Sequence, residues 1–204
     1  MLWRHGQTVW NAERRFQGQS DIPLDETGQV QAERAARLLA ALHPDMIISS
    51  DLTRAASTAA PLARLTGLEV TLDKDLRERH GGRWEGLTDA EIRAQYPQEY
   101  TRWAPPDGEP SAVVADRVAA ALQRVTTALT ESQAGSGLAV VVSHGAALRL
   151  GMSRLLGMPE DLFGVLGPLS NCSWSVLGLR GDGRRRLLEH NAGTLPEPIL
   201  SDDR

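Results

Sequence analysis

Side chains that can carry out chemistry follow short apolar runs at four points along the 204-residue chain. Arg4 and His5 follow an apolar pair at the start, and His144 follows the most apolar run of the sequence. Arg54 and Glu78 come soon after the two runs between them. Apolar runs of this length are typical of buried parallel strands, whose carboxyl ends form one ligand-binding edge. We therefore expect these five residues to meet at one edge of a sheet.

This set of side chains could transfer a phosphoryl group. A neutral His5 imidazole can attack phosphorus and form a phosphohistidine, while Arg4 and Arg54 offer planar donors that match phosphate geometry. A protonated His144 would donate to a phosphoryl oxygen, beside the backbone amides of the helix that starts after it. Glu78 is placed to protonate the leaving alkoxide and later to deprotonate a water molecule. This chemistry requires no metal and no other cofactor.

Polar and glycine positions near these five residues extend the predicted site. Asn11 and Gln17 are neutral donors suited to phosphoryl oxygens or to water, and the amide of Gly145 begins the helix after His144. His80 is two residues from Glu78 and could face the leaving group. The predicted substrate-binding and phosphate-binding residues are Asn11, Gln17, Gly18, His80, Trp84 and Gly145.

Each residue also has a purely structural interpretation. His144 could be a core histidine, Arg54 a helix-surface arginine and Glu78 one partner of a surface ion pair. The residues alone leave Glu85 open as a rival of Glu78 for the proton donor. A metal site is not indicated, because the histidines lack ligand-like spacing, and Ser143 lacks the Gly-x-Ser-x-Gly motif of a serine hydrolase.

Alternation of strands and helices predicts an α/β fold with a mostly parallel central sheet between helices. One domain is expected over 1–204, with a lid-like insertion over 82–110, irregular after its first helix, and a loose tail over 195–204. Asp25 or Thr27 could cap the first long helix, and Gln31 is expected on its solvent face. The expected strands are a short one over the residues before Arg4, then 46–48, 68–72, 138–142, 173–179 and 185–190, the last two forming a hairpin. The expected helices are 29–42, 52–65, 89–95, 112–131 and 146–156.

The composition of the chain limits the kinds of partner that it can bind. A net charge of −4 leaves no domain-wide basic face for nucleic acid. No apolar run approaches the roughly 20 residues of a membrane span. Cys172 is the sole cysteine, which excludes an intramolecular disulfide and favours the cytoplasm. The expected ligand is a small phosphate ester, with a homodimer as the candidate assembly.

Ten short motifs of this chain occur in the order and at the spacing that are typical of a known family. They are Arg4-His5-Gly6-Gln7-Thr8, Trp10-Asn11, Gln17-Gly18, Pro23-Leu24, Thr27-Gly28, Ser49-Ser50-Asp51-Leu52, Arg54-Ala55, Leu76-Arg77-Glu78, Gly82 with Trp84-Glu85-Gly86, and Val142-Ser143-His144-Gly145. On these the chain resembles the histidine phosphatase superfamily, the branch with phosphoglycerate mutases. The resemblance implies a phosphoglycerate mutase-like three-layer fold.

The same resemblance implies roles for the site residues. His5 would be phosphorylated, Glu78 rather than Glu85 would donate the proton, and Arg4, Arg54 and His144 would bind phosphate, with Asn11 and Gln17 at the rim. The short insertion, with only Arg83, Arg93 and Arg102 as basic residues, resembles phosphatases more than mutases.

The segment Asn171-Cys172-Ser173-Trp174-Ser175 is similar to actinobacterial glucosyl-3-phosphoglycerate phosphatases. The expected function is therefore metal-independent hydrolysis of a small sugar or glycerate phosphate. A phosphoglycerate mutase and a non-catalytic phospho-ligand binder are the alternatives.

Overall fold

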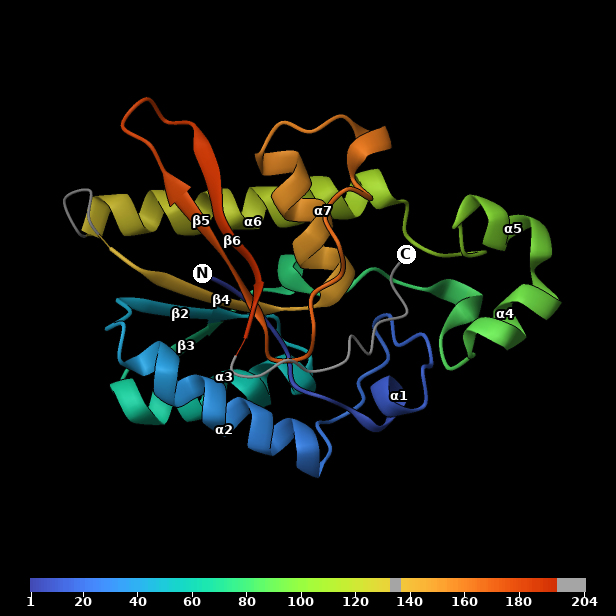
Figure 1. Cartoon of the computed structure of the whole chain (residues 1–204), viewed down its shortest axis with the longest axis horizontal. Helices are drawn as coiled ribbons and strands as arrows, with labels where there is room; N and C mark the ends of the chain where they lie inside the picture. The colour runs from blue at the N-terminus through green and yellow to red at the C-terminus, as the bar shows by residue number, and fades with distance from the viewer. Residues whose placement is uncertain (133–136, 194–204) are drawn as a thin grey trace.

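The computed structural model describes residues 1–132 and 137–193 (Figure 1). The predicted tail over 195–204 lies outside the described residues. Six strands form one sheet in the order β3-β2-β4-β1-β5-β6. The strands are β1 (Leu2–Arg4), β2 (Met46–Ser49), β3 (Val70–Leu72), β4 (Ala139–Ser143), β5 (Trp174–Leu179) and β6 (Arg185–Ala192).

The first four strands in that order are parallel, and β5 and β6 form an antiparallel hairpin at one side. The central strand β4 is buried at every residue, as expected for a parallel strand that is covered on both faces. Its neighbour β1 pairs Arg4 with Ser143, so the residues after the two strands emerge side by side. The mostly parallel sheet predicted from the sequence is confirmed.

Helices cover both faces of the sheet and make it a three-layer sandwich (Figure 1). On one face α2 (Glu26–Ala40) and α3 (Thr53–Thr66) pack around Trp3, Val140 and Val142. On the other, α6 (Ser111–Ser132) and α7 (Gly145–Leu155) pack around Leu2 and Val141. Neighbouring strand residues thus enter opposite cores, because a strand has a two-residue period. The predicted layer architecture is confirmed.

The first turns of α2 differ from the prediction. The helix starts at Glu26, with the Asp25 carboxylate accepting the Gly28 amide at 2.8 Å, so Asp25 rather than Thr27 is the cap. Gln31 is buried, not solvent-facing, and its side-chain oxygen accepts the amide of Gln7 at 2.9 Å. The reason is that the loop after β1, which continues into the capped short helix α1 (Val9–Ala12), packs over this part of α2.

The insertion over 82–110 is more regular than predicted. Its first helix, α4 (Asp89–Gln95), has the predicted bounds, but α5 (Pro97–Arg102) replaces the expected irregular chain. Proline is well tolerated at the first position of a helix, which removes the reason for expecting an interruption there. Both helices lie beyond the carboxyl ends of the parallel strands (Figure 1). Shorter 3-10 turns are η1 (Lys74–Leu76), η2 (Gly82–Trp84) and η3 (Glu160–Leu162).

An aromatic cluster forms the core of this insertion. Trp84 is fully buried, with its ring centroid 5.8 Å from that of Phe16 and 5.1 Å from that of Trp103. Tyr100 completes the cluster, 5.6 Å from Trp103. Edge-to-face pairs of this kind add stability beyond the burial of their area. The cluster joins the loop after α1 to the insertion and thus fixes one wall of the site.

Candidate active site

A cavity of about 200 Å³ opens at the carboxyl ends of the parallel strands. Arg4, His5, Arg54 and Glu78 line it, although they come from distant parts of the chain. His144 lies behind this lining, fully buried, with its ring centroid 5.2 Å from that of His5. The structure therefore brings together the five residues that were expected to converge.

His5 is held by its backbone at the end of β1. Its amide donates to Ser143 O at 3.0 Å, and its carbonyl accepts from Cys172 N at 3.2 Å and from Asn171 Nδ2 at 3.1 Å. Its Nδ1 lies 2.7 Å from Gly6 O, and a carbonyl can only accept, so the hydrogen is on Nδ1 and Nε2 carries the lone pair. Burial, followed by the charges of Arg54 and Arg4, lowers the pKa of His5 well below 6.5. A neutral imidazole with a free Nε2 lone pair is the form needed for nucleophilic attack.

His144 ends β4 and precedes the first turn of α7. Its Nε2 lies 2.9 Å from Ser50 Oγ, and its buried Nδ1 has no hydrogen-bond partner within residues 1–132 and 137–193. Burial, then the charges of Arg54 and of His5, lower the pKa of His144 well below 6.5. Burial, together with the two arginines nearby, thus disfavours the protonated form of His144 that the sequence predicted.

The two arginines of the site are fixed by backbone carbonyls. Arg54, fully buried in the first turn of α3, donates to Gly18 O at 2.7 Å and to Ser20 O at 2.8 Å. Arg4 donates to Leu169 O. These bonds leave both guanidinium groups on the wall of the cavity, next to His5. A buried cation at the start of a helix is unfavourable by itself, and an anion bound there removes that conflict.

Glu78 and Glu85 occupy different environments. The Glu78 carboxylate lies on the cavity wall and accepts the amides of Ala146 at 3.1 Å and Ala147 at 2.9 Å, at the start of α7. Glu85 is not among the lining residues, and its carboxylate accepts the amide of Gly81 together with those of the loop next to Gly18. The geometry thus favours Glu78 as the carboxyl group that can reach a ligand.

The other predicted site residues divide into two groups. Gln17 and Gly18 line the cavity, and Gly145 begins α7 directly after His144. Gly18 has a φ of +53°, and a Cβ there would meet Glu85 Oε1 at 2.1 Å, so a larger residue would strain the backbone and displace the Glu85 carboxylate.

Asn11, His80 and Trp84 lie outside the lining of the cavity. Asn11 Oδ1 accepts the amide of Thr8, the N-cap of α1, at 3.1 Å and Asn171 Nδ2 at 3.2 Å, and Trp84 is buried in the aromatic cluster. His80 is exposed, and its Nε2 lies 3.8 Å from a Glu85 carboxylate oxygen. These placements give Asn11 and Trp84 supporting positions behind the site, where the sequence predicted contact with a ligand.

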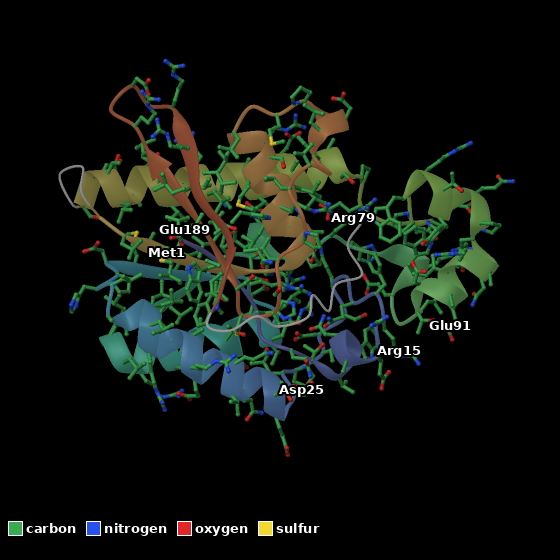
Figure 2. All side chains as sticks on the ribbon, viewed as in Figure 1. Met1, Arg15, Asp25, Arg79, Glu91 and Glu189 are labelled. Carbon is green, nitrogen blue, oxygen red and sulfur yellow. The ribbon has the colours of Figure 1, made fainter. Side chains whose placement is uncertain are left out.

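Sequence reasoning missed the outer part of the cavity. Arg79 and Arg149 line it, and both are at least nine-tenths buried. Arg79 donates to Glu109 O and Trp103 O, and it lies between α7 and the insertion (Figure 2). Arg149 could have been found from the sequence, because it is a charged residue within the otherwise apolar first part of α7. The remaining lining residues of this part are Phe16, Trp103, Ser111, Ala112, Ala146, Leu150, Glu160, Phe163 and Gly164.

Two kinds of feature are absent from the described ranges, 1–132 and 137–193. No cluster of three or more His, Cys, Asp or Glu residues there is arranged to hold a metal ion. No helix there is long and apolar enough to cross a membrane.

A buried histidine beside two arginines and a carboxylate, at the strand ends of this sandwich, is the arrangement expected of a phosphohydrolase of the histidine type. The chain belongs to the histidine phosphatase superfamily (branch 1), whose family model matches residues 1–192. It is accordingly a hydrolase of phosphate monoesters.

Relatives with a named activity lie within the same superfamily. The chain is 42% identical over 193 residues to the glucosyl-3-phosphoglycerate phosphatase of Mycolicibacterium vanbaalenii, covering 90% of this chain and 86% of that one. A solved mycobacterial glucosyl-3-phosphoglycerate phosphatase complexed with VO3 superposes with a TM-score of 0.88 at 37% identity, covering 94% and 98% of the two chains. A probable phosphoglycerate mutase of Citrobacter koseri is 41% identical over 181 residues, covering 85% and 81%.

Proposed function

We propose that the chain hydrolyses glucosyl-3-phosphoglycerate through a phosphohistidine formed on His5. The observation that carries the proposal is the Nε2 lone pair of a neutral His5, held between the buried Arg4 and Arg54 and beside Glu78. The relatives in mycobacteria support the choice of substrate.

In the first half-reaction His5 Nε2 attacks phosphorus, and the bond from phosphorus to the ester oxygen breaks. Arg4 and Arg54 neutralise the charge on the equatorial oxygens, which is the main requirement of phosphoryl transfer. The unpartnered Nδ1 of His144 donates to one of these oxygens, while the Ser50 hydroxyl donates to His144 Nε2. Glu78, in its carboxylic acid form, gives its proton to the departing alkoxide.

In the second half-reaction the Glu78 carboxylate takes a proton from water, and the water oxygen attacks the phosphohistidine. The phosphorus–nitrogen bond breaks, inorganic phosphate leaves and His5 regains its lone pair. Glu78 is again protonated, so that the site is ready for the next ester. No step needs a group beyond the residues named.

The outer part of the cavity suits an anionic leaving group. Arg79 comes directly after Glu78 in sequence and lines the same cavity. Arg149 lines the same cavity from α7. Guanidinium groups bind carboxylates with two parallel hydrogen bonds, and 3-phosphoglycerate carries a carboxylate at the other end of its three-carbon chain from the phosphate ester. The aromatic side chain of Trp103 offers an apolar surface for a sugar ring.

Phosphate release from a substrate panel tests the proposal. We expect the highest kcat/KM with glucosyl-3-phosphoglycerate, above 3-phosphoglycerate and simple sugar phosphates. Conversion of 3-phosphoglycerate to its 2-isomer with a bisphosphate primer, without phosphate release, would identify a mutase instead. Phosphate binding without turnover of any ester would identify a binding protein.

A matched pair of variants tests the leaving-group contacts. Arg149→Met should raise KM for glucosyl-3-phosphoglycerate by about tenfold or more, since one charge-assisted contact contributes about 1.5 to 3 kcal/mol, and should change KM for p-nitrophenyl phosphate much less. Arg102→Met, on the exposed side of the insertion, should leave both values unchanged. Equal effects of Arg149→Met on both esters would contradict this assignment.

The remaining predictions on organisation stay part of the proposal. The chain acts as one domain over 1–204 with 82–110 as a lid, in the cytoplasm and as a homodimer. The aromatic cluster that joins the insertion to Phe16 supports the single domain. Light scattering of the purified chain measures the assembly directly.

A further inference from the structure

Arg117 joins the long helix α6 to the backbone of the segment that carries Glu78. Its guanidinium donates to Asp75 O at 2.9 Å, to Arg77 O at 2.7 Å and to Glu78 O at 2.9 Å. The same group pairs with the Glu109 carboxylate through two hydrogen bonds of 2.7 Å. Few side chains can make this many directed bonds, and the planar guanidinium can.

Glu109, at the end of the insertion, holds the same segment from its other side. Its amide donates to His80 O at 2.9 Å, its carboxylate accepts the His80 amide at 3.3 Å, and its carbonyl accepts Arg79 Nε at 2.7 Å. Both side chains of the ion pair are more than four-fifths buried. The segment over 75–80 has little regular structure of its own after η1, and this pair supplies several of its tertiary hydrogen bonds.

The two ends of Glu78 are thus fixed by different elements. Its carboxylate is bound by the first amides of α7, and its carbonyl by Arg117 and by Gln19 Nε2 at 3.1 Å. A proton donor must sit within hydrogen-bond distance of the leaving oxygen, and a displacement of about 1 Å can cost about a hundredfold in rate. The backbone anchor therefore bears on proton transfer as well as on folding.

We propose that Arg117, with Glu109, is a positioning residue for proton donation by Glu78. The proposal rests on the proposed function, in which Glu78 is the proton donor. Arg117 is absent from the lining of the cavity and acts through the backbone of Glu78. Because Glu109 ends the insertion, the pair also ties the base of the lid to the acid.

The test compares two esters that differ in their need for an acid. A p-nitrophenolate leaves without protonation, whereas the alkoxide of glucosyl-3-phosphoglycerate requires it. Arg117→Gln should lower kcat/KM, which reports the transfer to His5 and not the later hydrolysis of the phosphohistidine, at least about tenfold more for the alkyl ester than for the aryl ester, as a misplaced acid requires. It should also have little further effect in a Glu78→Gln background. An equal loss with both esters, or a full additional loss in that background, would overturn the proposal.

Arg124→Gln is the control. Arg124 lies on the same helix and bonds Asp73 at 2.8 Å and Asp75 at 2.7 Å, but it does not contact Glu78. It should leave the ratio of the two rates unchanged, and a shift equal to that of Arg117→Gln would overturn the proposal. If Arg117→Gln does not fold, Glu109→Gln removes the ion pair and gives the same readout.

Failure of the proposed function is distinguishable. If Glu78→Gln itself lowers kcat/KM equally for both esters, Glu78 is not the proton donor, and the positioning role falls with it. If Glu78→Gln is selective for the alkyl ester but Arg117→Gln is not, only the positioning role is overturned.

Discussion

The imidazole rings of His5 and His144 lie with their centroids 5.2 Å apart and their planes inclined at 59°. The strands before them, β1 and β4, are parallel neighbours in register, which is why two residues from distant parts of the chain meet. Both rings are buried beside the same two arginines. This arrangement keeps both rings neutral, so one can attack phosphorus and the other can donate a hydrogen bond.

The lowered pKa values predict a pH dependence of stability. Between pH 6.5 and the lower folded pKa values, the unfolded chain binds protons at His5 and His144 that the folded chain does not. The free energy of unfolding should therefore fall as pH decreases below about 6.5. Urea denaturation from pH 7.5 to 5 measures this slope. His5→Asn should flatten it, whereas the exposed His43→Asn should not; equal slopes in all three proteins would refute the explanation.

Arg54 should control anion affinity. Phosphate or vanadate at a hundred times its Kd should raise the free energy of unfolding by about 2.7 kcal/mol. In Arg54→Met the affinity should drop at least about tenfold, because charge-assisted bonds of about 1.5 to 3 kcal/mol are lost. Thermal shifts with increasing phosphate measure both effects. Arg64→Met, an exposed arginine of the same helix, serves as the control, and an undiminished phosphate shift in Arg54→Met would rule out its role.

The loop that carries the site depends on a close backbone contact at Gly28. A Cβ at Gly28 would meet Gln7 O at 2.0 Å and Gln7 N at 2.7 Å. Gly28→Ala should therefore destabilise the protein by about 1 to 3 kcal/mol, the usual cost of overpacking. Gly181→Ala, in the exposed hairpin turn with no neighbour within 4 Å, should change stability by less than about 0.5 kcal/mol. Equal stabilities of the two variants, measured by urea denaturation, would argue against a constrained loop.

The sequence was sufficient to predict the site residues whose position depends only on the arrangement of the strands. Apolar runs before His5 and His144 mark buried strands, and parallel strands bring the residues at their carboxyl ends to one edge of the sheet. The sequence alone could not decide between Glu78 and Glu85 as the carboxyl group of the site. The structure distinguishes them, because the Glu78 carboxylate accepts the first amides of α7 whereas that of Glu85 accepts the Gly81 amide.

The outer cavity could not be predicted in this way. Arg79 and Arg149 reach it through tertiary contacts with the insertion and from the middle of a helix, and no local pattern encodes either. Gln31 and Trp84 were misjudged for a related reason. A polar side chain on a helix is expected to face solvent, but the loop after β1 covers Gln31. A tryptophan in a charged loop is expected near a ligand, but Trp84 is buried in the aromatic cluster.

The central claim is that His5 carries the phosphoryl group during turnover. Acid quenching destroys phosphohistidine, so the protein should be mixed with substrate for milliseconds, denatured in alkali, digested and analysed by mass spectrometry. The account predicts one phosphoryl group on the peptide that contains His5, lost on brief acid treatment, and neither label nor turnover in His5→Ala. Full activity of His5→Ala, or an acid-stable phosphoryl group elsewhere in the chain, would contradict it.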